Sequence, residues 1–159
     1  MRSYAGWWSR VGAALFDLMV ISVPAFVLAF VVFGSVSAAS SADDDFGLVT
    51  LIVALIAYVG ALFAAALLYA PLLMRREGEK NGQTWGKQVL GIRVIRTNGV
   101  PMDFTHSAIR EALVKGLGLA FASSVVPLLP YVLDGLWPLW DDEHRAVHDM
   151  VVGTRVVEA

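Results

Sequence analysis

The sequence predicts an all-α membrane protein, a helical transmembrane bundle with a short cytoplasmic β-hairpin segment. Two apolar runs, at 11–34 and 48–74, each exceed the roughly 20 helical residues that cross a hydrocarbon core. A third apolar region, at 117–140, is interrupted by prolines. Only 16% of the 159 residues are charged, against about 25% in average soluble domains. We therefore expect one membrane domain over residues 1–159, in contact with the lipid bilayer.

The first apolar run contains a carboxylate, Asp17, seven residues after Arg10. An acidic residue at this depth costs about 2.5–3.5 kcal/mol on insertion scales, so such residues mark functional sites by default. Arg10 and Asp17 share a helix face, but two turns separate them by roughly 10 Å along the axis. We expect each to find a partner on another helix, where Asp134 and Arg110 are available. The pattern fits a proton or cation relay, and it equally fits a buried ion pair that fixes helix packing.

The N-terminal run also invites comparison with a secretory signal, because Val36-Ser37-Ala38 resembles a cleavage site. The run has about 23 residues, whereas the apolar core of a signal has about 7–15. It also contains Asp17 and Pro24. We expect this helix to stay in the mature protein.

The basic residues predict the orientation. Segment 75–115 holds eight of the twelve Lys and Arg residues, whereas loop 35–46 has none and contains three Asp residues. The positive-inside rule places segment 75–115 and the N-terminus in the cytoplasm and loop 35–46 outside. The chain is then a multi-pass protein.

Segment 75–115 contains the predicted hairpin. Residues 89–96 are rich in β-branched side chains, and Asn98-Gly99 after them is the strongest short hairpin signal. Residues 100–104 are expected to pair back on this strand. An isolated hairpin is marginal in water, so it must dock on the membrane or on the helices.

The third apolar region, 117–140, is long enough to cross once, but three prolines interrupt it and Asp134 lies inside. A proline in a helix interior costs about 3 kcal/mol or more. Two shorter helices meeting near Pro127 and Pro130 would form a broken hairpin, which a membrane tolerates where it is buried in protein or lines a cavity. A single crossing puts the C-terminus outside and a hairpin returns it to the cytoplasm; the pattern leaves both open.

Two motifs invite functional interpretations. The segment containing Gly82, Thr84, Gly86 and Lys87 resembles a phosphate-binding loop, but three residues separate its glycines instead of four and no Ser or Thr follows the lysine. A tight cytoplasmic turn against the membrane fits it better.

His144 and His148 have the i,i+4 spacing of helical zinc ligands, but Arg145 occupies the place of the catalytic Glu and a zinc site needs three or four convergent ligands. We expect no metal and no other cofactor. The chain has no GxSxG motif, which argues against a Ser-His-Asp hydrolase. Together with the membrane features, this leads us to expect no enzyme. The net charge of −2 argues against a nucleic-acid partner.

Together these pieces resemble the RDD family of small bacterial membrane proteins, named for one arginine and two aspartates. Arg10 and Asp17 match its first two signature residues, and 82–87 with 90–94 match its central GQTxGKxxxGxRV stretch. Arg110, His148-Asp149 and residues 153–157 match its HDxxxGTxVV ending, with Asp149 as the second aspartate. Asp134 is not part of this pattern.

The resemblance implies a protein of the bacterial inner membrane, with transport suggested for the family and sodium/proton exchange for some members. We expect ion or small-solute transport in which Asp17 binds or exchanges an inorganic cation or a proton and Arg10 tunes Asp17. Residues 82–87 and 148–149 would form an inner gate, which favours a cytoplasmic tail. So few helices enclose a polar path only as a homo-oligomer. The competing hypothesis is a non-transporting scaffold or assembly factor.

Overall fold

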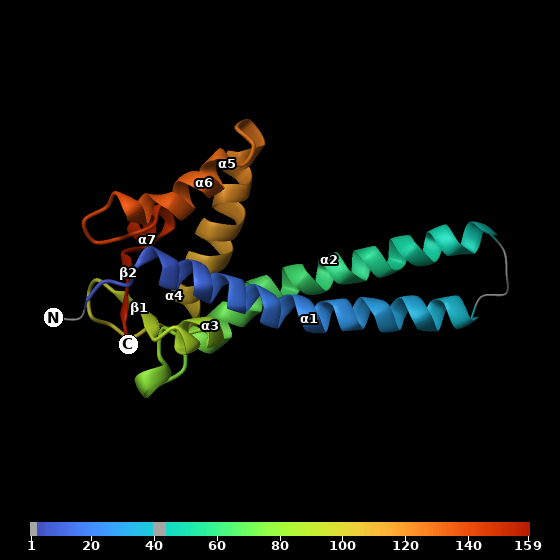
Figure 1. Cartoon of the computed structure of the whole chain (residues 1–159), viewed down its shortest axis with the longest axis horizontal. Coiled ribbons are helices and arrows are strands. Elements are labelled where there is room, and N and C mark those ends of the chain that lie inside the picture. The colour runs from blue at the N-terminus through green and yellow to red at the C-terminus, as the bar shows by residue number, and fades with distance from the viewer. Residues whose placement is uncertain (1–2, 40–43) are drawn as a thin grey trace. The chain divides into compact units, whose positions relative to one another are not determined.

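The computed structural model describes residues 3–39 and 44–159, most of which are helical. The chain divides into two compact units, a core unit formed by Met1–Asp17 with Leu67–Ala159 and a helical unit formed by Leu18–Ala66. In chain order the elements (Figure 1) are α1 (Trp7–Ala39), α2 (Asp44–Met74), the 3₁₀ turn η1 (Gly78–Lys80), α3 (Trp85–Val89), β1 (Ile92–Arg96), α4 (Phe104–Ala108), the π-helix η2 (Ile109–Gly118), α5 (Leu119–Val125), α6 (Leu129–Leu136), the 3₁₀ turn η3 (Trp137–Leu139), α7 (Val147–Val152) and β2 (Thr154–Glu158).

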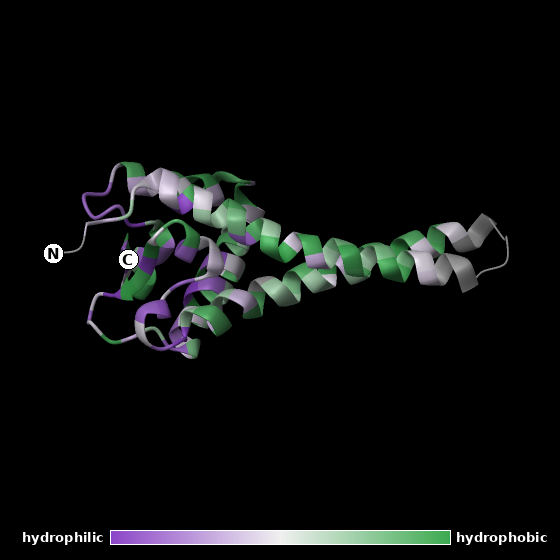
Figure 2. Cartoon of the chain, turned by 60° about the horizontal axis from the view of Figure 1, so that its bottom comes forward, coloured by the Kyte–Doolittle hydropathy of each residue, from purple (hydrophilic) through white to green (hydrophobic). Residues whose placement is uncertain are grey.

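Helices α1 and α2 contain the stretches that are long and apolar enough to cross a membrane, Trp7–Ser35 with 29 residues and Gly47–Met74 with 28. They cover the two runs predicted from the sequence. Many large apolar side chains of these helices are exposed, and the helices are largely green in Figure 2. Helix α2 ends directly before the first basic residues of segment 75–115. Residues 40–43 of the predicted acidic loop lie outside the described residues.

The sheet joins the middle of the chain to its end. Strands β1 and β2 pair antiparallel, with Val94 opposite Val156, and an N-terminal bridge joins Tyr4 to Val157. The predicted hairpin is therefore wrong about the partner strand, because β1 pairs with the C-terminal tail and not with residues 100–104. The sheet brings segment 75–115, the tail and the N-terminal segment together.

The third apolar region is broken, as its prolines predict. The helix formed by α4, η2 and α5 ends at Val125, and α6 begins at Leu129. Leu128 between them has a positive φ of 64°, which turns the chain back. Figure 1 shows α5 and α6 as the two arms of a helical hairpin.

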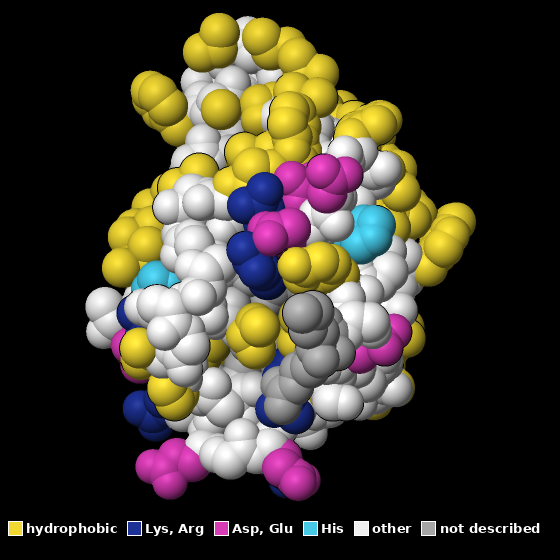
Figure 3. Space-filling view, turned by 90° about the vertical axis from the view of Figure 1, so that its left-hand side faces the viewer, with side chains coloured by type: hydrophobic (Ala, Val, Ile, Leu, Met, Phe, Trp, Pro, Cys, Tyr) yellow, Lys and Arg dark blue, Asp and Glu magenta, His cyan; other side chains and the backbone are white. Residues whose placement is uncertain are grey.

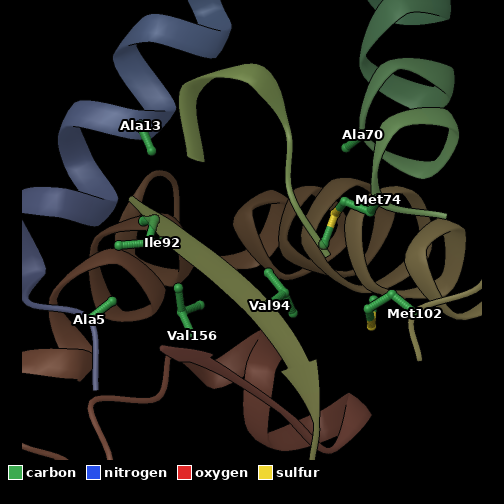
Figure 4. Close-up of a cluster of buried hydrophobic side chains, with 8 residues drawn as sticks. All are labelled: Ala5, Ala13, Ala70, Met74, Ile92, Val94, Met102 and Val156. Atoms are coloured by element: carbon green, nitrogen blue, oxygen red, sulfur yellow. The ribbon is translucent and has the colours of Figure 1, made fainter. Parts of the chain in front are cut away.

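The buried core lies where α1, α2 and the sheet meet (Figure 4). Small side chains from the beginning of α1 allow the helix to approach the β-branched residues of the strands closely. Met74 at the end of α2 is fully buried in the same cluster. The cluster comprises Ala5, Ala13, Ala70, Met74, Ile92, Val94, Met102 and Val156. This core positions Arg10 and Asp17 on α1 against the segments that follow α2.

Candidate functional site

Three hydrogen-bond donors surround the Asp17 carboxylate. The Tyr69 hydroxyl of α2 donates to Oδ1 at 2.7 Å, and the Thr84 hydroxyl donates to Oδ2 at 2.5 Å. The backbone N–H of Gly86 donates to Oδ1 at 2.7 Å. Among the residues that the structure describes, no Lys, Arg or His forms an ion pair with this carboxylate. Among the described residues, neutral groups alone therefore hold this carboxyl group on a membrane-length helix. We call Asp17, Tyr69, Thr84 and Gly86 the Asp17 site.

The motif Gly82–Lys87 is the loop that carries two of these donors to Asp17. Gly82 has a φ of +73°, and a Cβ there would lie 1.9 Å from the carbonyl oxygen of Val94, so this turn requires glycine. Thr84 caps α3 by accepting from the Lys87 N–H at 3.3 Å, while its hydroxyl donates to Asp17. The phosphate-loop resemblance therefore reflects a loop that binds a carboxylate of its own chain.

Gly86 permits the close approach of α3 to α1. A Cβ at this position would lie 2.2 Å from the carbonyl oxygen of Ala13 and 2.9 Å from the Asp17 carboxyl group. Because no side chain fits between the helices, the Gly86 N–H can point directly at the carboxylate. The ring of Tyr69 packs edge-on against Trp85, with centroids 6.2 Å apart, and this contact orients the Tyr69 hydroxyl.

Asp149 is the centre of a second cluster and is fully buried. Its Oδ2 accepts from Arg10 at 3.0 Å, and its Oδ1 accepts from Arg110 at 2.6 and 3.0 Å. The Thr154 hydroxyl donates to the same Oδ1 at 2.9 Å. Burial alone would raise the pKa of Asp149, but Arg110, His148 and Arg10 outweigh it and lower that pKa. We call Asp149 with its two arginines the Asp149 cluster.

The π-helix η2 supplies Arg110 and Glu111, which also contact each other. Lys115 reaches Glu111 at 3.4 Å, and it is the exposed end of this chain of charges. Burial opposes the charge of Glu111, but Lys115, Arg110 and Lys87 hold its pKa well below the usual value. Burial also opposes the charge of Arg110, yet Asp149 and Glu111 raise its pKa. Long π-helical stretches are rare and often occur at functional sites.

His148 lies between two carboxylates. Its Nδ1 is 2.8 Å from both oxygens of Asp134, and its backbone N–H donates to Asp134 Oδ1 at 2.8 Å. Its Nε2 is 3.6 Å from Asp149 and, within the described part of the chain, has no hydrogen-bond partner. Burial and the charge of Arg110 lower the pKa of His148, while the two carboxylates oppose that shift.

Lys87 is half-buried, and its ammonium group makes no ion pair with any described residue. Burial lowers the pKa of Lys87 to about 8, and the charges of Arg110 and Lys115 act in the same direction. Glu111 and Asp17 oppose this shift. The pKa of Lys87 therefore depends on a residue of each cluster, Asp17 and Arg110.

Six of the predicted site residues belong to the two clusters, Asp17, Thr84 and Gly86 to the Asp17 site and Arg10, Arg110 and Asp149 to the Asp149 cluster. Asp134, His148, Gly82 and Lys87 lie outside both as defined, and the partners of the charged residues differ from those expected. Arg10 pairs with Asp149 instead of Asp134, and Asp17 has no contact with Arg110. Asp134 instead holds His148. Arg10 also makes no ion pair with Asp17, in agreement with their predicted separation.

Three side chains of these clusters, Tyr69, Glu111 and Thr154, were not among the predicted site residues, although the sequence does predict the i,i+4 pair of Glu111 with Lys115 that the structure contains. Tyr69 carries a hydroxyl group near the end of the apolar run 48–74, directly before the basic segment. A polar group at that place in the run was the signal that could have identified it. Glu111 follows the matched arginine directly. Thr154 belongs to the GTxVV ending, where a buried hydroxyl beside a matched aspartate marks a hydrogen bond.

The paired histidines do not form a helical metal site. His144 precedes α7, has a φ of 52°, and its Nδ1 lies 2.8 Å from the carbonyl oxygen of Pro138. In residues 3–39 and 44–159, no group of three or more His, Asp or Glu side chains is arranged to hold a metal ion.

Surface ion pairs surround the tail. Arg145 contacts Asp141 at 3.0 Å and Glu143 at 3.1 Å, and Arg155 contacts Glu143 at 2.7 Å. On the face shown in Figure 3, acidic and basic side chains lie next to one another. The hydrogen bonds from Arg145 lower the pKa of Asp141 to about 2. These side chains are partly exposed, and ion pairs near the surface contribute little to stability.

Comparisons with known proteins agree with the motif resemblance. The RDD family model matches residues 4–153. Two proteins of Bacillus subtilis (strain 168) are similar in sequence. "Uncharacterized protein YxaI" is 24% identical over 163 residues, which covers 99% of each chain. "Uncharacterized protein YckC" is 24% identical over 155 residues, 98% of this chain and 85% of that relative. No solved structure matches. Since the family match covers nearly the whole chain and all three signature residues, the chain belongs to the RDD family.

Proposed function

We propose that this protein is an integral membrane protein that exchanges an inorganic cation against a proton at Asp17. One observation carries the proposal: a carboxylate on a membrane-length helix is held, within the described part of the chain, only by neutral donors, two of which are hydroxyl groups. Intramembrane carboxylates are expensive and mark ion pathways and proton relays.

The hydroxyl groups suit both states of an exchanging carboxylate. A hydroxyl group donates one hydrogen bond and also accepts through its lone pairs, whereas a guanidinium group only donates. Tyr69 and Thr84 therefore donate to the carboxylate, and each can turn a lone pair toward a protonated acid or a bound cation. Carboxylate and hydroxyl oxygens are ligands for hard cations such as Na⁺. The Asp149 cluster contrasts with this, because its two arginines lock that carboxylate in the charged form.

The exchange requires the Asp17 site to be reached from the cytoplasm. Tyr69 lies five residues before the end of α2, about 7.5 Å along the helix, where the basic segment begins. The pairing of β1 with β2 supports a tail on the same side as segment 75–115, and the positive-inside rule makes that side cytoplasmic. Two membrane-length helices cannot enclose a polar path through the bilayer. Such a path is therefore completed in a homo-oligomer.

Flux measurements on the purified full chain in proteoliposomes test the proposal. A sodium gradient should drive proton movement with the unchanged protein, and Asp17→Asn should reduce that movement to the level of protein-free vesicles. Asp142→Asn is the matched control, because Asp142 is exposed. Full flux with Asp17→Asn, at equal protein content, contradicts the proposal.

A second candidate function is a non-transporting scaffold or assembly factor. The Asp149 cluster favours it, because a buried carboxylate paired with two arginines fixes the positions of the segments that carry them. On this alternative, Asp17→Asn removes the protein from the membrane or unfolds it, and the unchanged protein moves no ions.

A further inference from the structure

The α5–α6 hairpin has an apolar surface that the core unit leaves uncovered. Phe121 and Val125 on the first arm are 79% and 78% exposed, and Leu128 at the turn is 71% exposed. Such a contiguous patch on a protein surface marks a partner. In Figure 3 hydrophobic side chains crowd the upper part of the molecule, which is where Figure 1 places this hairpin. The remaining exposed members are Val126, Leu129, Tyr131, Val132 and Leu133.

Charge is absent from this surface. Residues 116–133 contain no Asp, Glu, Lys, Arg or His. The one carboxylate of α6, Asp134, is turned inward, where it is 5% exposed and holds His148. A water-soluble protein partner would bring polar rim contacts, whereas lipid acyl chains require none.

The aromatic residues give the depth of the hairpin. Trp7 at the start of α1 donates from its indole nitrogen to the carbonyl oxygen of Gly135 at 2.7 Å, so the end of α6 lies beside the start of a membrane-length helix. Trp8, the next residue after Trp7, is 77% exposed, and Trp140, five residues after Gly135, is 68% exposed. Exposed tryptophans of this kind lie at the headgroup level.

The return arm is too short to cross, and the uncharged end of the first arm, residues 116–125, spans only about 15 Å at the α-helical rise. Helix α6 has eight residues, about 12 Å at the α-helical rise, against a hydrocarbon core of roughly 30 Å. The turn also has few free donors, because Pro127 and Pro130 have no N–H and the Leu129 N–H donates to Pro127 at 2.8 Å. Fewer unpaired N–H groups lower the cost of placing the turn among acyl chains.

We propose that the α5–α6 hairpin inserts into the cytoplasmic leaflet of the bilayer and does not cross it, with acyl chains covering the surface around Leu128. The hairpin is then a third membrane attachment beside α1 and α2, and it holds Asp134 and His148 at the membrane surface. This attachment does not depend on ion exchange at Asp17, so either proposal can fail alone.

Single-cysteine labelling tests the insertion directly, because the chain has no cysteine of its own. The full chain carries Leu128→Cys or, as a second position on the first arm, Phe121→Cys. Val100→Cys, on an exposed turn after β1, is the matched control. A membrane-impermeant maleimide is applied to intact cells and to inverted membrane vesicles. We expect Val100→Cys to react in inverted vesicles only, and both hairpin positions to react from neither side.

A nitroxide attached at each hairpin position then identifies what covers it. In lipid, collisions with oxygen should be frequent and collisions with a polar relaxation agent rare. Labelling of Leu128→Cys in intact cells would show a hairpin that crosses the bilayer. Labelling in inverted vesicles at the rate of the control would show a hairpin in water. Magnetic coupling between nitroxides of two copies would show that a second chain covers the surface. Each of these three results overturns the proposal.

Discussion

The contact between Asp17 and a backbone N–H depends on residue 86 being glycine. Any side chain at Gly86 would collide with the carbonyl oxygen of Ala13 and with the carboxyl group. The backbone of α1 cannot move away without disturbing the buried cluster around Ala13, so the loop must withdraw. The Asp17 site is therefore determined by packing as much as by its polar groups.

Gly86→Ala should lower stability and weaken the Asp17 site. Overpacking of this kind costs about 1–3 kcal/mol, so we expect a lower midpoint of thermal unfolding in detergent and reduced ion flux. Gly6→Ala is the matched control, because a Cβ there meets no atom within 4 Å. Equal midpoints for the two variants would mean that α3 does not approach α1 as described.

His148 predicts how stability depends on pH. Burial lowers the pKa of His148, so the folded protein keeps this imidazole neutral while the unfolded chain takes up a proton near pH 6.5. The unfolded state then binds more protons as the pH falls below about 6.5, and stability falls with it. The carboxylate of Asp149 has a lowered pKa, so its contribution is lost only at more acidic pH.

We therefore expect the unfolding midpoint in detergent to fall between pH 7 and pH 5, and to fall less with His148→Asn, whose amide can still donate to Asp134. His144→Asn is the matched control and should behave as the unchanged protein, because the contacts of His144 with described residues, the Pro138 carbonyl oxygen and the Tyr4 ring, include no carboxylate. If the unfolding midpoint changed with pH by the same amount in all three proteins, His148 would not be the cause of the pH dependence.

At the scale of elements, the sheet shows where local sequence patterns mislead. The Asn98-Gly99 turn is present: Gly99 has a φ of +75° and the Asn98 side chain accepts from Val100 at 3.1 Å. The residues after it do not return to β1. The Asn81 side chain accepts from the Met102 N–H and donates to the Met102 carbonyl oxygen, each at 2.8 Å. These backbone groups are then not available to pair with β1. The tail then pairs with β1, and this distant pairing leaves no local signal.

Disulfide trapping distinguishes the two strand partners. Ile92→Cys with Glu158→Cys joins residues that face each other across β1 and β2, and it should oxidise readily to an intramolecular disulfide. Ile95→Cys with Met102→Cys joins the positions that the local hairpin would have placed opposite each other. We expect it to remain reduced under the same conditions, as shown by mobility on a non-reducing gel. A disulfide in the second variant and none in the first would contradict the sheet.

At the scale of the whole molecule, the sequence was sufficient for the membrane-length helices, the proline break and the family. These features depend on composition and on motifs in fixed order. The partners of the charged residues could not be predicted, because they depend on which segments the fold brings together. Arg10 reaches Asp149 only because the tail returns to the sheet. Asp17 is reached by Tyr69 and Thr84 from two segments more than fifty residues away in the chain.

The two clusters give α1 two distinct roles. Arg10 is fixed by a charged partner near the start of the helix, and Asp17, two turns later, is held by groups that can change from donors to acceptors. The proposed exchange requires Asp17 to give up a proton when a cation binds.

Infrared difference spectroscopy of the reconstituted protein measures this exchange at the carboxyl group itself. Adding Na⁺ at constant pH should remove the band of a protonated carboxylic acid in the unchanged protein and in Asp142→Asn, and Asp17→Asn should lack that change. Identical difference spectra for the unchanged protein and Asp17→Asn would contradict the account.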